Sequence, residues 1–268
     1  MKVTLMAHTQ LTQEFFDIAG EGFHDDSANQ LATDGQAVAL TAIRTCYSPN
    51  KPSEIVAKEG AKYFSKSATD GEGGTEADRL IRTIMRSKHL STVEHLTFTF
   101  AVEGVSRALL GQLTRHRAGF SFSVQSQRYV KFGSSDKSGG FGYVVPDRVG
   151  EQEVPGYQYS VDIDEDGDVT EWANYKAIEI FESHMHHAQD TYNKLRKAGV
   201  PAEDARSVLP NAAATNLVMT VNLRALLDFY AKRKVGRGAQ SEITQLAERL
   251  REEVVAVEPW VNQFFEEA

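Results

Sequence analysis

Residues 96–102 read Leu-Thr-Phe-Thr-Phe-Ala-Val, a strict alternation of large apolar side chains with smaller or polar ones. Successive side chains of a strand point to opposite sides, so the large ones share one face. The stretch therefore predicts a strand with one buried face. Residues 106–116 change to helical spacing through Leu109, Leu110 and Leu113, which predicts a helix soon after the strand.

The rest of the chain adds mainly helices. Helical spacing of apolar residues predicts helices over 36–47, 77–88, 171–198 and 240–266, a short strand over 217–221 and a helix that opens at Asn222. Alternating strands and helices without repeats or a linker indicate one α+β domain over residues 1–268.

One part of this domain looks like an insertion, at about residues 132–170. Residues 132–143 are rich in Gly and Ser and predict a mobile loop. Asp166-Gly167, between the β-prone residues 157–161 and 169–170, predicts a hairpin turn.

The overall composition bounds the function. The chain has 268 residues and a formal net charge of -8, which argues against a broad basic surface for nucleic acid. No stretch approaches the roughly 18 consecutive apolar residues of a membrane helix, and the N-terminus lacks a signal-peptide pattern. We expect a soluble cytoplasmic protein with neither a membrane nor a nucleic-acid partner.

Cys46 is the only cysteine, which excludes an intrachain disulfide and a site built from several thiolates. It stands at an apparent helix end before Ser48-Pro49. A catalytic thiol needs a nearby base or a helix N-terminus, so we expect a buried structural thiol.

Against the acidic total, donors for an anion are concentrated around one short segment. Guanidinium groups grip phosphate or carboxylate in a planar fork, and hydroxyls and amides add neutral donors. The segment and the helix before it contain Arg107, Gln112, Arg115, Arg117, Ser121, Ser123, Gln125, Ser126, Gln127 and Arg128. We therefore expect an anionic ligand here.

Other polar residues allow two interpretations. Ser91 and Glu94 fit a capping box, or could face the same ligand together with His89. Asn222 could be only a helix N-cap, and Arg233 only a cation that a helix C-terminus favours.

A metal site is not expected. Residues 162–167 imitate the start of a calcium loop, but its twelfth position is Ala173 instead of Glu. The histidines at 184, 186 and 187 lie on a predicted helix face without a convincing ligand set. The chain also has no Gly-x-Gly-x-x-Gly and no Walker loop.

The order of these motifs is distinctive. It runs His89-Leu-Ser91-x-x-Glu94-His95, Arg107, Arg115-His116-Arg117, Ser126-Gln127-Arg128-Tyr129, Arg206 before Leu209-Pro210, Asn222 and Arg233. Over about residues 36–250 the chain closely resembles the flavin-dependent thymidylate synthases. Two spacings, residues 118–125 and 234–238, are each one residue longer than is usual in that family.

The resemblance implies a homotetramer with a central, mainly antiparallel sheet flanked by long helices and with active sites shared between subunits. It implies reductive methylation of dUMP to dTMP, with methylenetetrahydrofolate as carbon donor and NADPH-reduced FAD as hydride source. FAD would be bound by His89, Ser91, Glu94, Arg115, His116, Arg117, Asn222 and Asp228. The nucleotide dUMP would be bound by Arg107, Gln112, Gln125, Ser126, Gln127, Arg128, Arg206 and Arg233. Arg233 would be the catalytic group that polarises the pyrimidine.

Two alternatives stay open. Arginines and aromatic residues around 107–131 could form a surface for single-stranded nucleic acid. The chain could also be an FAD-dependent reductase of other specificity.

Overall fold

The computed structural model describes residues 1–23 and 31–267, and the chain divides into two compact units. The hairpin unit consists of Met1, Glu103–Leu113 and Val124–Leu217. The sheet unit consists of Lys2–Val102, Thr114–Ser123 and Val218–Ala268. The single domain over 1–268 stays a prediction.

A four-stranded sheet has the strand order β1-β2-β6-β3. The strands are β1 (Lys2–His8), β2 (Thr97–Ser106), β3 (Phe120–Val124) and β6 (Ala214–Asn222). Strand β6 runs antiparallel to β3, because the Asn222 N–H donates to the Gly119 carbonyl while the Gln125 N–H donates to the Asn216 carbonyl. The protein is thus a mixed α and β structure with a small antiparallel sheet.

The strand predicted from the alternation over residues 96–102 is confirmed as β2. Phe98, Phe100 and Val102 are 1%, 0% and 0% exposed, so the alternation marks a face that is fully buried. Burial of such a side chain contributes roughly 1.5–3 kcal/mol.

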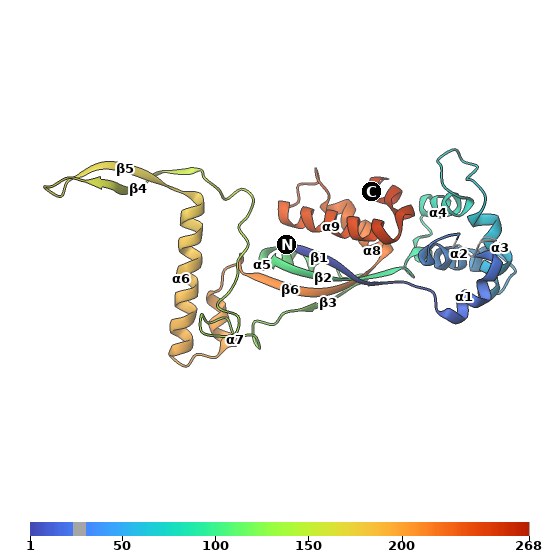
Figure 1. Cartoon of the computed structure of the whole chain (residues 1–268), viewed down its shortest axis with the longest axis horizontal. Helices are drawn as coiled ribbons and strands as arrows, with labels where there is room; N and C mark the ends of the chain where they lie inside the picture. The colour runs from blue at the N-terminus through green and yellow to red at the C-terminus, as the bar shows by residue number, and fades with distance from the viewer. Residues whose placement is uncertain (24–30, 268) are drawn as a thin grey trace. The chain divides into compact units, whose positions relative to one another are not determined.

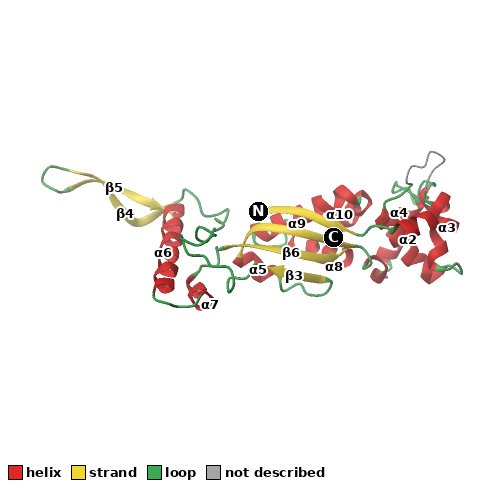
Figure 2. Ribbon diagram, turned by 60° about the horizontal axis from the view of Figure 1, so that its bottom comes forward, coloured by secondary structure: helices red, strands yellow, loops and turns green. Residues whose placement is uncertain are grey.

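Helices α8 (Leu223–Arg233) and α9 (Ser241–Val257) cover one face of this sheet (Figures 1 and 2). Helix α8 starts where Asn222 predicts it, because the Asn222 side chain accepts from the Ala225 N–H at 2.9 Å. The single helix expected over 240–266 is wrong. It stops before Pro259, which cannot continue a helix, and α10 (Asn262–Glu267) follows.

The N-terminal helices of the sheet unit pack around a core of their own that includes Phe23, Leu40 and Ile55. They are α1 (Gln13–Ala19), α2 (Asp34–Tyr47), α3 (Ile55–Phe64) and α4 (Glu76–Arg86). Helices α2 and α4 confirm the predictions over 36–47 and 77–88, and each begins with a capping box, at Thr33 and at Thr75.

The hairpin unit contains β4 (Glu153–Ile163), β5 (Val169–Lys176) and the helices α5 (Arg107–Leu113), α6 (Ala177–Lys197) and α7 (Ala202–Ala205). Strands β4 and β5 form an antiparallel hairpin, as the Asp166-Gly167 turn indicates. The helix expected from residue 171 begins instead at Ala177, because residues 171–176 pair with β4. No helix within residues 1–23 and 31–267 combines the length and the apolar character that crossing a bilayer requires.

The Gly-rich segment 132–143 lies against α6. Phe132 and Phe141 are buried, and the Phe132 N–H donates to the Tyr192 hydroxyl at 3.2 Å. Gln189 accepts from the Phe141 N–H at 2.8 Å and donates to the Phe132 carbonyl. Mobility of this segment stays a prediction.

Candidate active site

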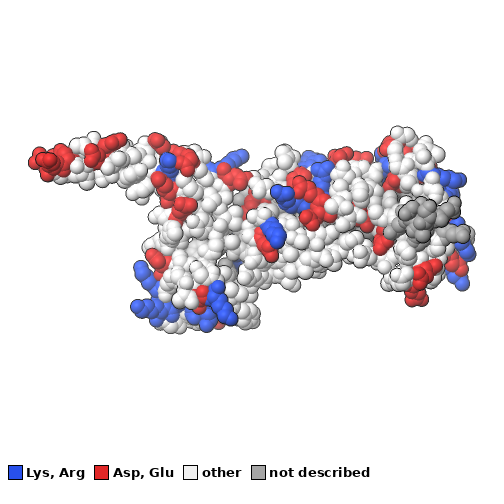
Figure 3. Space-filling model, in the orientation of Figure 1, with Lys and Arg blue, Asp and Glu red and all other residues white. Residues whose placement is uncertain are grey.

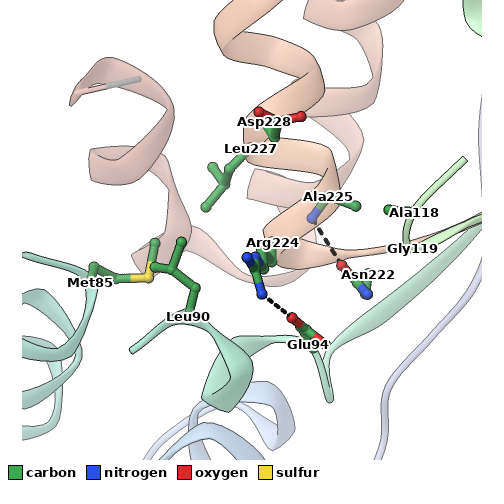
Figure 4. Close-up of a pocket in the computed structure, with 10 residues that line it drawn as sticks. All are labelled: Met85, Leu90, Glu94, Ala118, Gly119, Asn222, Arg224, Ala225, Leu227 and Asp228. Carbon is green, nitrogen blue, oxygen red and sulfur yellow. Dashed lines mark hydrogen bonds and ion pairs between the residues drawn. The ribbon is translucent and has the colours of Figure 1, made fainter. Parts of the chain in front are cut away.

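The sheet unit contains a cavity of about 580 Å³ beside the start of α8 (Figure 4). Its walls come from α4 and the turn after it, from the segment before β3, and from α8. The lining residues are Met85, Leu90, Glu94, Ala118, Gly119, Asn222, Arg224, Ala225, Leu227 and Asp228. Three of the predicted flavin residues, Glu94, Asn222 and Asp228, are therefore brought together.

Charges in this cavity are paired. The Arg224 Nη1 donates to the Glu94 carboxylate across the cavity (Figure 4). Asp228 forms an ion pair with Lys232 at 2.6 Å. Of the two interpretations of Ser91 and Glu94, the capping box is not the one found, because the Glu94 carboxylate binds Arg224 and no side chain caps the turn Leu90–Val93. Paired charges beside the apolar Leu227 suit an aromatic ligand with polar edges.

Gly119 lets the chain approach the start of α8 closely. Its φ is +75°, and an added Cβ would lie 2.6 Å from the Ala225 Cβ and 2.8 Å from the Asn222 Nδ2. Only glycine fits both the backbone conformation and the space. Gly119 was not among the predicted site residues, because a single glycine after the Arg-His-Arg motif does not indicate a close approach until the helix that faces it is known.

His116, the central residue of the Arg-His-Arg motif, contacts Arg233. Two nitrogens of Arg233, Nε and Nη2, lie 3.2 and 3.1 Å from the His116 Nε2. Arginine can only donate, so the imidazole is neutral and accepts through Nε2. Burial, and next the nearby Arg233, lowers the pKa of His116 below its ordinary value of 6.5. The Phe229 ring packs against the imidazole at 5.0 Å.

The neutral His116 makes a pH dependence testable. Below its pKa the ring would carry a proton on Nε2, lose Arg233 as donor and repel it, so activity is expected to fall on the acidic side. The unfolded chain then binds more protons than the folded one, so the free energy of unfolding also falls as pH drops below 6.5. Glutamine at this position can accept at every pH. An acid limb unchanged in His116→Gln pH profiles would contradict this role.

The other predicted flavin residues lie outside the cavity lining. His89 Nδ1 is 3.1 Å from the Tyr47 hydroxyl, at the end of α2. Ser91, Arg115 and Arg117 are exposed. Their contacts with a flavin stay predictions.

The hairpin unit contains a second, polar cavity of about 490 Å³, lined by Arg107, Gln127, Glu203, Asp204, Arg206 and Ser207. Burial, and next the nearby Arg206, lowers the pKa of Arg107. Two guanidinium groups thus share one cavity and repel each other. An anion bound there would relieve that repulsion and accept from both.

Glu203 organises the cations around this cavity. Its carboxylate accepts from Arg128 Nη2 at 2.9 Å and Nε at 3.0 Å, and its carbonyl accepts from Arg206 Nε at 3.0 Å. Glu203 was not among the predicted site residues, because it is 75 residues from Arg128 in the sequence. Only the folded chain reveals that pairing.

The remaining predicted nucleotide residues divide between the units. Gln127 is 8% exposed, the Ser126 hydroxyl accepts from the Arg128 N–H at 3.2 Å, and Gln125 accepts from the Asn216 side chain at 3.1 Å. These residues and Gln112 of α5 belong to the hairpin unit, whereas Arg233 belongs to the sheet unit.

Cys46 corrects another expectation. Its thiol is exposed, not buried, and donates only weakly to the Ala42 carbonyl at 3.7 Å. Exposure alone does not supply the activation that a nucleophilic thiol needs.

Comparison with known proteins agrees with these motifs. Residues 30–260 match the family model described as thymidylate synthase complementing protein. A flavin-dependent thymidylate synthase from Geobacter sulfurreducens is 36% identical over 232 residues, which cover 87% of this chain and 82% of the relative.

Solved structures share the fold. The UMP/dUMP methylase PolB from Streptomyces cacaoi, bound with 5-Br dUMP, has a TM-score of 0.63 at 22% identity and covers 99% of this chain and 94% of its own. ThyX from Helicobacter pylori, complexed with FAD and dUMP, has a TM-score of 0.60 at 20% identity and covers 100% and 99%. The family match and the similarity of the relatives show that the chain belongs to the flavin-dependent thymidylate synthase family.

Proposed function

We propose that this protein converts dUMP to dTMP, taking a one-carbon unit from methylenetetrahydrofolate and a hydride from FAD that NADPH has reduced. The observation that carries the proposal is the pair Arg107 and Arg206 facing one polar cavity in a member of this family. A nucleotide phosphate is the anion that such a pair suits.

The cavity of the sheet unit fits a flavin. Met85, Leu90 and Leu227 offer apolar wall, while Asn222 and the Glu94–Arg224 pair offer polar atoms. Its volume of about 580 Å³ is in the range of cofactor sites. When bound, the flavin supplies the hydride chemistry. The residues around it bind and orient the ring and exclude water.

The nucleotide would be held by the hairpin-unit residues. Arg107 and Arg206 bind the phosphate, and Arg128, fixed by Glu203, adds a third donor group nearby. Gln112, Gln125, Ser126 and Gln127 complete the predicted set with neutral donors and acceptors. The site contains positioning groups and needs no thiol nucleophile from the chain.

Arg233 would stabilise negative charge that develops on the pyrimidine. His116 is the residue that positions it, because the Nε and Nη2 atoms of Arg233 both lie within hydrogen-bond distance of the His116 Nε2. A guanidinium held at two nitrogens loses less freedom when the substrate arrives.

We also propose that the protein acts in the cytoplasm as a homotetramer whose active sites are shared between subunits. The support for both is the family resemblance. Sedimentation velocity of the purified protein measures the subunit number directly.

Flavin content and NADPH oxidation test the function. Purified protein should be yellow, and its NADPH oxidation should rise when dUMP is added. Oxidation that is indifferent to dUMP would indicate a general flavin reductase. A colourless protein that binds single-stranded DNA with steep salt dependence would favour the nucleic-acid alternative.

Gly119→Ala is expected to lower flavin occupancy strongly. The new methyl group would collide with Ala225 and Asn222 at the cavity wall. Gly111→Ala is the matched control, because nothing lies within 4 Å of a Cβ there. The flavin to protein absorbance ratio measures the result. Equal flavin occupancy in both variants would show that Gly119 does not shape the flavin site.

Cys46→Ser is expected to retain activity, because the proposed reaction places no covalent bond on the protein. The measurement is the rate of dTMP formation compared with that of the unchanged protein. Complete loss in a folded variant would require a thiol mechanism.

A further inference from the structure

The β4–β5 hairpin is the most acidic part of the chain. Residues 149–175 contain eight Asp and Glu side chains and no Lys or Arg. This segment alone therefore accounts for the formal net charge of -8, and the rest of the chain is balanced. Red side chains mark the free end of the hairpin in Figure 3.

The same hairpin exposes large apolar side chains. Tyr157, Val161, Ile163 and Trp172 are each more than half exposed. Tyr157 and Tyr159 both contact the Tyr175 ring, at 4.9 and 4.8 Å between centroids, so the three tyrosines form one aromatic stripe. Tyrosine and tryptophan are the residues most enriched at the energetic centres of protein interfaces.

A hairpin of this kind is poorly stabilised alone. Two strands without a third strand or a covering helix are marginal in water, and exposed apolar patches on soluble proteins mark interaction sites. In both ribbon views the hairpin leaves the N-terminal end of α6 and runs away from that helix (Figures 1 and 2). The stripe is therefore available to another surface.

The opposite end of α6 carries the complementary charge. Lys194 and Lys197 are exposed in its last turn, and Lys131 and Lys137 are exposed in the segment that packs on Tyr192 and Asn193. None of these four lysines has an ion-pair partner among the residues that the structure describes. Blue side chains gather around this end of α6 in Figure 3.

We propose that the hairpin is an arm that binds the basic C-terminal end of α6 in a second copy of this chain. The two copies form a two-fold pair in which each arm contacts the other copy's lysines. Two-fold symmetry makes the same contact twice, because the acidic arm of each copy binds the basic surface of the other copy. One acidic and one basic surface per chain are therefore enough to form a closed dimer. The arm deepens the proposed homotetramer by naming one of its interfaces.

The lengths of the elements suit this pairing. Helix α6 has 21 residues and β4 has 11. These correspond to about 31 Å and about 36 Å of chain. In a pair of antiparallel α6 helices, the N-terminal end of one helix is level with the C-terminal end of the other. An arm that leaves the N-terminal end of one α6 can therefore reach across about 36 Å toward the lysines of the other copy.

Removing the exposed aromatic rings tests the apolar half of the arm. Tyr157→Ser, Tyr159→Ser and Trp172→Ser combined should raise the dissociation constant of the pair at least about thirtyfold, the effect of losing one interface hot spot. Ile18→Ser, an exposed apolar residue of α1, is the control. Sedimentation velocity across a concentration series measures the constant. Unchanged assembly of the triple variant overturns the proposal.

A charge swap tests which surface the arm meets. Glu165→Lys, Asp166→Lys and Glu171→Lys should weaken the pair about tenfold at low ionic strength, and so should Lys137→Glu, Lys194→Glu and Lys197→Glu. Combining all six should restore the constant to within about threefold of the unchanged protein. Glu252→Lys with Glu266→Lys, both exposed in the sheet unit, is the charge control.

If the variant with all six substitutions does not recover the dissociation constant, α6 is not the surface that the arm binds. The masses are measured without substrate, so they are independent of the reaction. If neither charge swap changes the assembly while dTMP formation stays normal, the hairpin is not an assembly arm. The proposed function would be unaffected by that result.

Discussion

Arg233→Ala is expected to abolish dTMP formation, with a fall of about 10²-fold or more in kcat, the usual effect of removing one preorganised donor. Arg233 is the last residue of α8, and its side chain donates to the His116 Nε2. Its backbone carbonyl accepts from the Thr244 hydroxyl at 2.8 Å, a contact that the substitution keeps. The fold should therefore survive while the polarising charge is lost.

Arg237→Ala is the matched control, because Arg237 is an exposed arginine in the turn after α8. It should keep nearly full activity and flavin content. Rates of dTMP formation under saturating substrates, with circular dichroism spectra of both variants, decide the matter. Normal turnover by Arg233→Ala would refute the catalytic role.

Arg206→Ala is expected to raise KM for dUMP by roughly ten- to a hundredfold, the range of one hydrogen bond to a charged group. Arg206 shares its cavity with Arg107, and burial makes their repulsion costly in the absence of an anion. Removing one guanidinium should therefore stabilise the free protein slightly while weakening the nucleotide complex. Flavin occupancy should not change, because Arg206 is absent from the lining of the other cavity.

Arg206→Lys should recover only part of the affinity, since a point charge replaces a planar fork. Arg249→Ala, an exposed arginine paired with Glu252, is the control for loss of a surface cation. Equal KM values for Arg206→Ala and Arg249→Ala would show that the polar cavity does not hold the phosphate.

Local patterns predicted most of the elements, because the forces that set them are local. The alternation at 96–102 and the N-cap at Asn222 each depend only on residues that are close together in the sequence. Residues 171–176 were predicted as helix, but they form a strand because they pair with β4, and local sequence does not reveal that pairing. The break before Pro259 could have been seen, because proline disfavours a helical residue before it.

Some residues of the candidate site could likewise be predicted from the sequence, and others could not. Charged motif residues such as Arg107 and Arg206 could be named in advance because phosphate chemistry requires their side chains. The walls could not, because Gly119 and Leu227 are ordinary residues until α8 faces them. Arg224 was missed for a related reason, since its partner Glu94 is 130 residues away.

The central claim is most directly tested by tritium release from dUMP labelled at C5. With methylenetetrahydrofolate and NADPH present, the protein should release tritium to water in step with dTMP formation, and omission of either should stop it. Continued NADPH oxidation with no tritium released and no dTMP formed would contradict the account.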